Sequence, residues 1–235
     1  GKSMIKLVVF DLDNTLAPMY SPMKENTLAS LKNLSKKVHL AVASGKTPFY
    51  LAGFFRQAGI KDIKLIGENG AVTYLNSDLP CEVIYARVSQ KYLENREKIF
   101  SDIKKLLSNK ICFQPNEIAL SFFYKGKKDK EKIENYLKSQ NYNDIDIYYF
   151  DKSVDICPKN VNKAYGINRL AKKMEIEPNE IIIVGDSEND ISMAKFTPYS
   201  IGIGNLKENV RYNVKDINSA LHLLNIMGDE IGWKL

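Results

Sequence analysis

The sequence is poor in the residues that build disulfide frameworks and zinc sites. Among its 235 residues there are three cysteines and two histidines. Cys81, Cys112 and Cys157 are far apart and form no C-x-x-C pair. This scarcity argues against a disulfide-stabilised extracellular fold and a structural zinc site, and it is typical of a protein of the reducing cytoplasm. His39 and His222 lie in segments typical of a core, and neither is assigned a role.

The sequence also lacks the features of membrane and nucleic-acid-binding proteins. No apolar run approaches the length of a membrane span, and strand-like sequence from Ile5 is unlike a signal peptide. The formal charge of +6 is dispersed, and its densest run, Lys125–Lys130, has no interleaved aromatic residues. We therefore expect a cytoplasmic protein that binds neither membrane nor nucleic acid, although its basicity favours attraction of an anionic substrate.

Two aspartates follow directly after the first apolar segment. Ile5–Phe10 is rich in β-branched residues, which is typical of an interior strand of a parallel sheet, and Asp11 and Asp13 come at its carboxyl end. Open α/β sheets bind ligands at that edge. Two carboxylates so close indicate a divalent-metal site in which one aspartate is a nucleophile. Taken alone, the segment is equally compatible with a capped turn.

A second apolar segment ends in the same way. Ile181–Gly185 is followed by Asp186 and, four residues later, by Asp190, and we expect residues 189–196 to form a helix. If the two strands are neighbours, their carboxylates converge on one edge of the sheet and form an oxygen-ligand site suited to Mg²⁺ and a phosphate. The alternative is that Asn189 or Asp190 is an ordinary helix N-cap, and the repetition of the pattern weakens it.

Two further segments carry groups that suit a phosphate. Ser44, Gly45 and Lys46 follow the strand-like segment His39–Ala43. The hydroxyl of Ser44 could bind a phosphate oxygen, and Gly45 would allow a ligand to come close to the main chain. The segment is no P-loop, because the required glycine five residues earlier is absent. Lys163 opens a helix and could neutralise phosphoryl charge, although a plain turn and an ordinary lysine remain the alternatives for these segments taken singly.

The order of the expected elements predicts an α/β core interrupted by a smaller module. Strands and helices alternate before residue 80 and again from Lys163, whereas residues between them follow a β-α-β-β-α-β-β order typical of an antiparallel sheet with helices on one side. Asn69-Gly70 predicts a tight hairpin turn between two strands. We expect a Rossmann-like parallel-sheet core formed by residues 4–79 and 159–235, and an inserted α+β module formed by residues 80–158.

Taken together, these motifs resemble those of a known family. Asp11-Leu12-Asp13-Asn14-Thr15, Ser44, Lys163 and the segment 185–190 occur in the order of the four-part signature of haloacid dehalogenase-like (HAD) phosphatases. The insert between Ser44 and Lys163 is similar to the type IIB cap found in sugar-phosphate and phosphoglycolate phosphatases. Two positions depart from the common pattern. Asn14 stands where glycine is commonest, and Lys46 stands where arginine or asparagine is frequent, which bears on how substrate is held.

The resemblance implies a mechanism. Asp11 would attack phosphorus to give an aspartyl-phosphate, and Asp13 would protonate the leaving alcohol and then activate water. Mg²⁺ would be bound by Asp11, the main-chain carbonyl of Asp13 and Asp186, with Asp190 orienting metal-bound water. The phosphoryl oxygens would be held by Ser44, Lys163 and the backbone amides near Leu12 and Gly45. Asn189 would contact the phosphate or the cap, and Lys46 would help to hold the substrate.

The predicted function is therefore Mg²⁺-dependent hydrolysis of a small phosphorylated metabolite, such as a sugar phosphate or a phosphoglycolate-like ester. A phosphotransferase or phosphomutase on the same site is an alternative, and a receiver-type signalling domain that keeps a phospho-aspartate is another. The second aspartate at Asp13 and the inserted module argue against the receiver domain. The sequence leaves the substrate, the cap residues that read it and the oligomeric state open.

Overall fold

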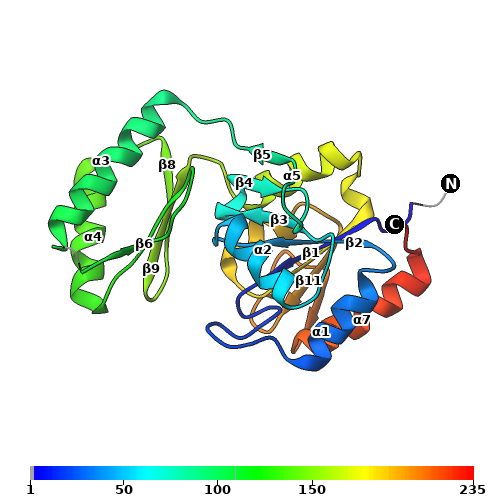
Figure 1. The fold of residues 1–235 in the computed structure, drawn as a ribbon. Coiled ribbons are helices and arrows are strands. Elements are labelled where there is room, and N and C mark those ends of the chain that lie inside the picture. Colours follow the sequence, from blue (N-terminus) through cyan, green and yellow to red (C-terminus); the bar gives the residue numbers. More distant parts are fainter. Residues whose placement is uncertain (1–2, 109) are drawn as a thin grey trace.

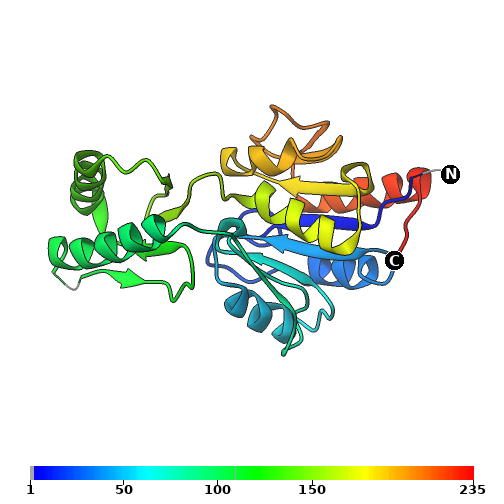
Figure 2. The same ribbon diagram turned by 90° about the horizontal axis from the view of Figure 1, so that it is seen from above.

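The computed structural model describes residues 3–108 and 110–235, which form an α/β core and a smaller cap (Figures 1 and 2). The core sheet has the strand order β12-β11-β10-β1-β2-β3-β4-β5. The first six of these strands are parallel to one another. At the remaining edge, β4 pairs with β3 in the antiparallel sense, and β5 pairs with β4 in the same way. The strands are β1 (Leu7–Asp11), β2 (His39–Ala43), β3 (Lys64–Gly67), β4 (Val72–Tyr74), β5 (Val83–Tyr85), β10 (Ile181–Gly185), β11 (Tyr199–Ile203) and β12 (Tyr212–Val214).

Helices cover both faces of this sheet. One face packs on α1 (Glu25–Leu34), α2 (Pro48–Gln57) and α7 (Ile217–Ile231). The other packs on α5 (Lys163–Met174) and the short α6 (Ile191–Ala194). This three-layer arrangement explains why β1 and β10 are buried at every position and show no apolar–polar alternation. Short 3-10 helices precede or follow the strands, namely η1 (Glu68–Gly70), η2 (Pro178–Glu180) and η3 (Glu188–Asp190).

The cap is a four-stranded antiparallel sheet with two helices on one face. Its strand order is β6-β7-β9-β8, and its helices are α3 (Gln90–Leu106) and α4 (Gly126–Gln140). The strands are β6 (Cys112–Phe113), β7 (Leu120–Phe123), β8 (Ile145–Tyr149) and β9 (Ser153–Pro158). Here the strands do alternate. Phe122 and Val154 belong to the cluster that packs on the helices, while Phe123 and Asp155 line a pocket between the cap and the core.

The expected α/β core with a separate antiparallel cap is confirmed, and so is the pairing of the two acidic strand ends. β1 lies between β10 and β2 in the sheet. The Asn69-Gly70 hairpin is also confirmed, because β3 and β4 pair across it and both turn residues have positive φ angles of 57° and 99°. Within the described residues, no helix is long and apolar enough to cross a membrane.

The sequence-based assignment of three elements was wrong. Residues 83–88 were placed in the inserted module, but β5 pairs with β4 at the edge of the core sheet, since Val83–Tyr85 hydrogen-bond along Val72–Tyr74. We therefore propose that the cap begins after β5. The helix expected over 189–196 is only η3 followed by the four-residue α6. The edge strand β12 was missed, because three partly exposed residues carry little hydrophobic pattern.

Candidate active site

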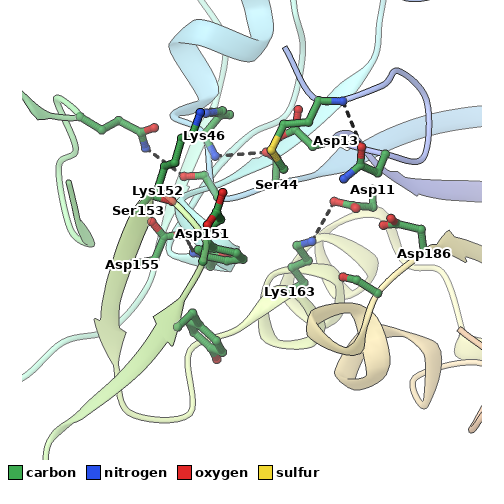
Figure 3. A pocket seen from close by; sticks show the side chains of 18 of the residues that line it. Asp11, Asp13, Ser44, Lys46, Asp151, Lys152, Ser153, Asp155, Lys163 and Asp186 are labelled. Carbon is green, nitrogen blue, oxygen red and sulfur yellow. Dashed lines mark hydrogen bonds and ion pairs between the residues drawn. The ribbon is translucent and has the colours of Figure 1, made fainter. Parts of the chain in front are cut away.

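The ends of three adjacent strands and the open face of the cap sheet enclose a pocket of about 360 Å³. Asp11 stands at the end of β1, Ser44 directly after β2, and Asp186 directly after β10. Lys163 enters from the first turn of α5 (Figure 3). The groups that the sequence placed at one sheet edge thus line a single pocket, because the carboxyl ends of neighbouring parallel strands meet there.

Three carboxylates lie close enough to share a cation. Oxygen atoms of Asp11, Asp186 and Asp190 all lie within 4.8 Å of one another. Burial raises the pKa of Asp11 well above its ordinary value and also raises the pKa of Asp186. A buried cluster of this kind costs free energy unless positive charge compensates it. Hard oxygen ligands in this number fit Mg²⁺.

Lys163 supplies part of that positive charge. Its Nζ lies 2.8 Å from Asp11 Oδ1 and 2.6 Å from Asp190 Oδ1, and only 8% of the residue is exposed. Burial alone would lower the pKa of Lys163, but the two carboxylates hold it above its ordinary value. The lysine therefore stays protonated and is fixed beside the nucleophile predicted at Asp11. The side chain of Asn162 caps this helix by accepting from the backbone N–H of Tyr165.

Asp190 is held by the protein on both of its oxygens. Besides the contact to Lys163, its Oδ2 accepts from the backbone N–H of Asp186 at 3.0 Å. Asp190 is fully buried, and although burial opposes ionisation, Lys163 and these hydrogen bonds lower its pKa. Gly185 makes this loop possible, because a Cβ there would lie 2.7 Å from the Cβ of Asp190. Asp190 thus orients Lys163 and the loop that carries Asp186.

Ser44 lines the pocket, and its hydroxyl orders the loop that follows. Its Oγ accepts from the backbone N–H of Lys46 at 3.1 Å, and the residue is almost fully buried. Gly45 and Lys46 also line the pocket. Lys46, however, extends toward the cap. Its Nζ lies 5.2 Å from the centre of the Phe123 ring on β7.

The remaining predicted residues differ in how the structure places them. Asp13 lines the pocket, but its carboxylate does not belong to the acidic cluster found among the described residues. Leu12 is buried in the hydrophobic core and does not line the pocket, so only its backbone is available to a phosphate. The predicted role of Asn189 falls on a side chain outside the described part of the chain. Thr15, which was not predicted, donates from Oγ1 to Asp186 Oδ1 at 3.2 Å.

The cap contributes residues that sequence reasoning did not select. Asp155 is buried and accepts from Asn69 Nδ2 at 2.9 Å, and burial raises its pKa. Gln114 donates from Nε2 to the carbonyl of Gly45 at 2.9 Å. One available signal was an aspartate at the centre of the apolar strand β9, where a charge without a partner is costly. The cap side of the pocket is completed by Phe123, Tyr148, Phe150, Asp151, Lys152 and Ser153.

A second contact between cap and core lies beside the pocket. The carboxylate of Glu68, in η1, accepts from the backbone N–H groups of Glu117, Ile118 and Ala119 at 2.9–3.0 Å. From the cap side, the guanidinium of Arg96 donates to carbonyls of the same loop, including that of Ile118 at 2.9 Å. The loop that joins β6 to β7 is therefore held by a core carboxylate on one side and a cap guanidinium on the other.

Comparison with known proteins agrees with this geometry. The family model of haloacid dehalogenase-like hydrolases matches residues 8–91 and 82–219. Phosphoglycolate phosphatase of Methanosarcina acetivorans is 28% identical over 92% of this chain and 90% of its own length. A haloacid dehalogenase-like hydrolase from Bacteroides thetaiotaomicron has a similar structure, with a TM-score of 0.76 at 17% identity over 94% of this chain and 99% of its own.

The chain belongs to the haloacid dehalogenase-like hydrolases. Within that family it is a phosphatase. Its fold is similar to that of a subclass IIB sugar phosphatase, with a TM-score of 0.70 at 20% identity over 95% of this chain and 99% of the other.

Proposed function

We propose that the protein is a magnesium-dependent phosphatase that hydrolyses a small phosphorylated metabolite through an aspartyl-phosphate on Asp11. The observation that supports this most directly is the convergence of Asp11, Asp186 and Asp190 around the ammonium of Lys163. Phosphoryl transfer depends mainly on positioning and on stabilising charge, which these groups are suited to supply.

The proposed reaction has two steps. In the first, a carboxylate oxygen of Asp11 attacks phosphorus, the ester P–O bond breaks, and Asp13 gives its proton to the leaving alcohol oxygen. In the second, Asp13 takes a proton from water, whose oxygen displaces Asp11 from phosphorus and releases inorganic phosphate. Lys163, Ser44 and the backbone amides near Leu12 and Gly45 would bind the phosphoryl oxygens during both steps.

The metal would be held by the acidic end of the pocket. Asp11, Asp186 and the main-chain carbonyl of Asp13 are the groups that would bind Mg²⁺, with Asp190 orienting them. When bound, Mg²⁺ would neutralise charge on the phosphoryl group. The substrate is a phosphorylated metabolite of the sugar phosphate or phosphoglycolate type, which the names of the phosphatases similar to this chain support.

Phosphate release from a panel of esters tests this function. The panel contains sugar phosphates, phosphoglycolate, phosphoglycerates and nucleotides, each with Mg²⁺ and with EDTA. We expect at least one ester to be hydrolysed with a kcat/KM of about 10⁴ M⁻¹s⁻¹ or more, in the presence of Mg²⁺ and without an added phosphoryl acceptor. Equal release with Mg²⁺ and with EDTA for every ester would refute the proposal, and release that requires a sugar acceptor would indicate a transferase.

A further inference from the structure

The ammonium of Lys46 lies at the cap side of the pocket, away from the acidic cluster. It stands over the ring of Phe123 at 5.2 Å and over that of Tyr50 at 5.9 Å, measured to the ring centres. Figure 3 shows Lys46 beside the cap strand that carries Ser153, with Asp186 at the opposite end of the pocket. A substrate whose phosphoryl group lies at the acidic cluster would therefore present its leaving group to Lys46.

The charge of Lys46 has no carboxylate partner among the described residues. Lys163 makes two ion pairs, whereas Lys46 takes part in none within 4.0 Å. Aromatic faces attract a cation but do not neutralise it. Asp155 lies on the same wall and its carboxylate attracts Lys46, but it accepts a hydrogen bond from Asn69 and makes no ion pair with Lys46. The half-buried ammonium thus remains able to pair with an anion from the substrate.

The other charged side chains on this wall do not offer an equivalent site. Lys152 and Asp151 both line the pocket, but they are adjacent in sequence, exposed and of opposite charge. Solvent-exposed charges bind an anion weakly, because water and salt screen them. Lys46 is half-buried between two rings, where less water competes. The amide of Gln114 also lines this side, but its Nε2 already donates to the carbonyl of Gly45 and to Asn116 Oδ1.

We propose that Lys46 is a specificity residue that selects phosphate esters whose alcohol carries a second anionic group, a carboxylate or another phosphate. The inference rests on the proposed phosphatase function and adds to it the chemical class of the leaving group. It also makes the role expected for Lys46 more specific, from holding the substrate in general to pairing with the end of the substrate that is far from the transferred phosphoryl group. The pocket of about 360 Å³ has room for such an extended ester.

Two matched pairs of esters test this inference. In the first pair, 3-phosphoglycerate carries a carboxylate where glycerol 3-phosphate carries a neutral hydroxymethyl group. In the second pair, fructose 1,6-bisphosphate carries a second phosphate that fructose 6-phosphate lacks. We expect the wild-type kcat/KM to favour the anionic member of at least one pair by about tenfold or more, as a charge-assisted contact requires. The pair that shows the preference identifies the second anion.

Substitution of Lys46 tests the residue itself. We expect Lys46→Met to lower the preference for the anionic ester by about tenfold, and Lys46→Arg, which keeps the charge, to retain most of it. Lys104→Met is the matched control. It removes the same charge and a similar contact, at 4.7 Å from the Phe100 ring, but on helix α3 outside the pocket, so the preference should not change.

Three results would overturn the inference. A wild-type enzyme that favours the neutral member of both pairs has no such anion site. A parallel fall of both members in Lys46→Met, with the ratio unchanged, would show that Lys46 serves the phosphoryl group. If Lys46→Arg lost the preference for the anionic ester as fully as Lys46→Met does, charge would be ruled out as the cause. Failure of the proposed function is distinguishable, because the wild type would then hydrolyse neither member of either pair.

Discussion

At the scale of single residues, the buried pair formed by Asp11, the proposed nucleophile, and Lys163 is the centre of the candidate site. Asp11 is buried beside Lys163, and their Oδ1 and Nζ atoms are 2.8 Å apart. The same short contact serves reactivity and stability. It holds a reactive carboxylate in position, and it compensates a charge that burial alone would make costly.

Replacement of Asp11 separates reactivity from fold. Asp11→Asn keeps the shape of the side chain but removes the attacking anion, so we expect turnover to fall by about 10³-fold or more while the protein stays folded. Phosphate release and thermal unfolding followed by circular dichroism measure the two effects. Asp229→Asn, the same change at an exposed position of α7, should leave activity intact. Near-normal metal-dependent turnover by Asp11→Asn would contradict the mechanism.

Replacement of Lys163 tests the electrostatic balance of the cluster. Lys163→Met leaves Asp11 and Asp190 buried without their shared cation, so we expect a loss of about 3–5 kcal/mol in the free energy of unfolding. Added Mg²⁺ should restore part of it. Urea denaturation with and without Mg²⁺ measures both changes. The control Lys173→Met breaks an exposed pair with Glu82 and should cost about 1 kcal/mol or less. An equal cost for the two variants would contradict the assignment.

At the scale of elements, η1 and the loop between β6 and β7 connect the core to the cap. Gly70 allows η1 to lie against the start of α5, since a Cβ at this position would lie 2.0 Å from the carbonyl oxygen of Asn162. This close approach places Glu68 beneath the cap loop and Asn69 beside Asp155. One hairpin turn therefore carries both contacts, and the pocket depends on its geometry.

Replacement of Glu68 tests this connection. Glu68→Gln weakens three hydrogen bonds from backbone N–H groups to a buried carboxylate, so we expect a loss of about 1.5–3 kcal/mol in stability. Hydrogen exchange should become faster at the amides of residues 117–119. Urea denaturation and exchange measured by mass spectrometry report the two effects. Glu230→Gln makes the same change at an exposed side chain of α7 and should alter neither. Unchanged protection in Glu68→Gln would show that this contact does not hold the cap loop.

At the scale of the whole molecule, the core packs around two hydrophobic clusters and the cap around a third, which extends to Ala71 and Val72 of the core. The core and the cap share the pocket between them. A ligand that fills the pocket would contact both parts. Binding energy at the phosphate end would then favour the closed arrangement, which excludes water from the reaction.

Metal and phosphate together should therefore stabilise the folded molecule. At a ligand concentration of about 100 times its dissociation constant, binding adds about 2.7 kcal/mol, which corresponds to a rise of roughly 5–10 °C in Tm for a chain of this size. Differential scanning fluorimetry with Mg²⁺ and inorganic phosphate, each alone and combined, measures it. Asp186→Asn should lose the Mg²⁺-dependent part. A rise that EDTA does not reverse would argue against a metal at this site.

The sequence by itself determined which residues meet at the acidic end of the pocket, where the proposed reaction would take place. Asp11, Ser44, Asp186 and Lys163 were predictable because each follows a strand or opens a helix, and parallel strands bring such positions to one edge. The convergence of these residues depends on their spacing from the strand ends and on the topology of the core sheet. The strands and helices of the core leave a periodic pattern of apolar residues in the sequence.

Only the tertiary structure decided which residues form the other wall of the pocket. Asp155, Gln114 and Asn69 come from elements far apart in sequence, and their contacts depend on how the cap packs against the core. The direction of Lys46 toward Phe123 and the membership of β5 in the core sheet depend on the same packing. No local pattern encodes contacts of this kind. The strand or helix that carries a side chain determines which way it points, but the residues that it meets belong to another element and depend on how the two parts pack.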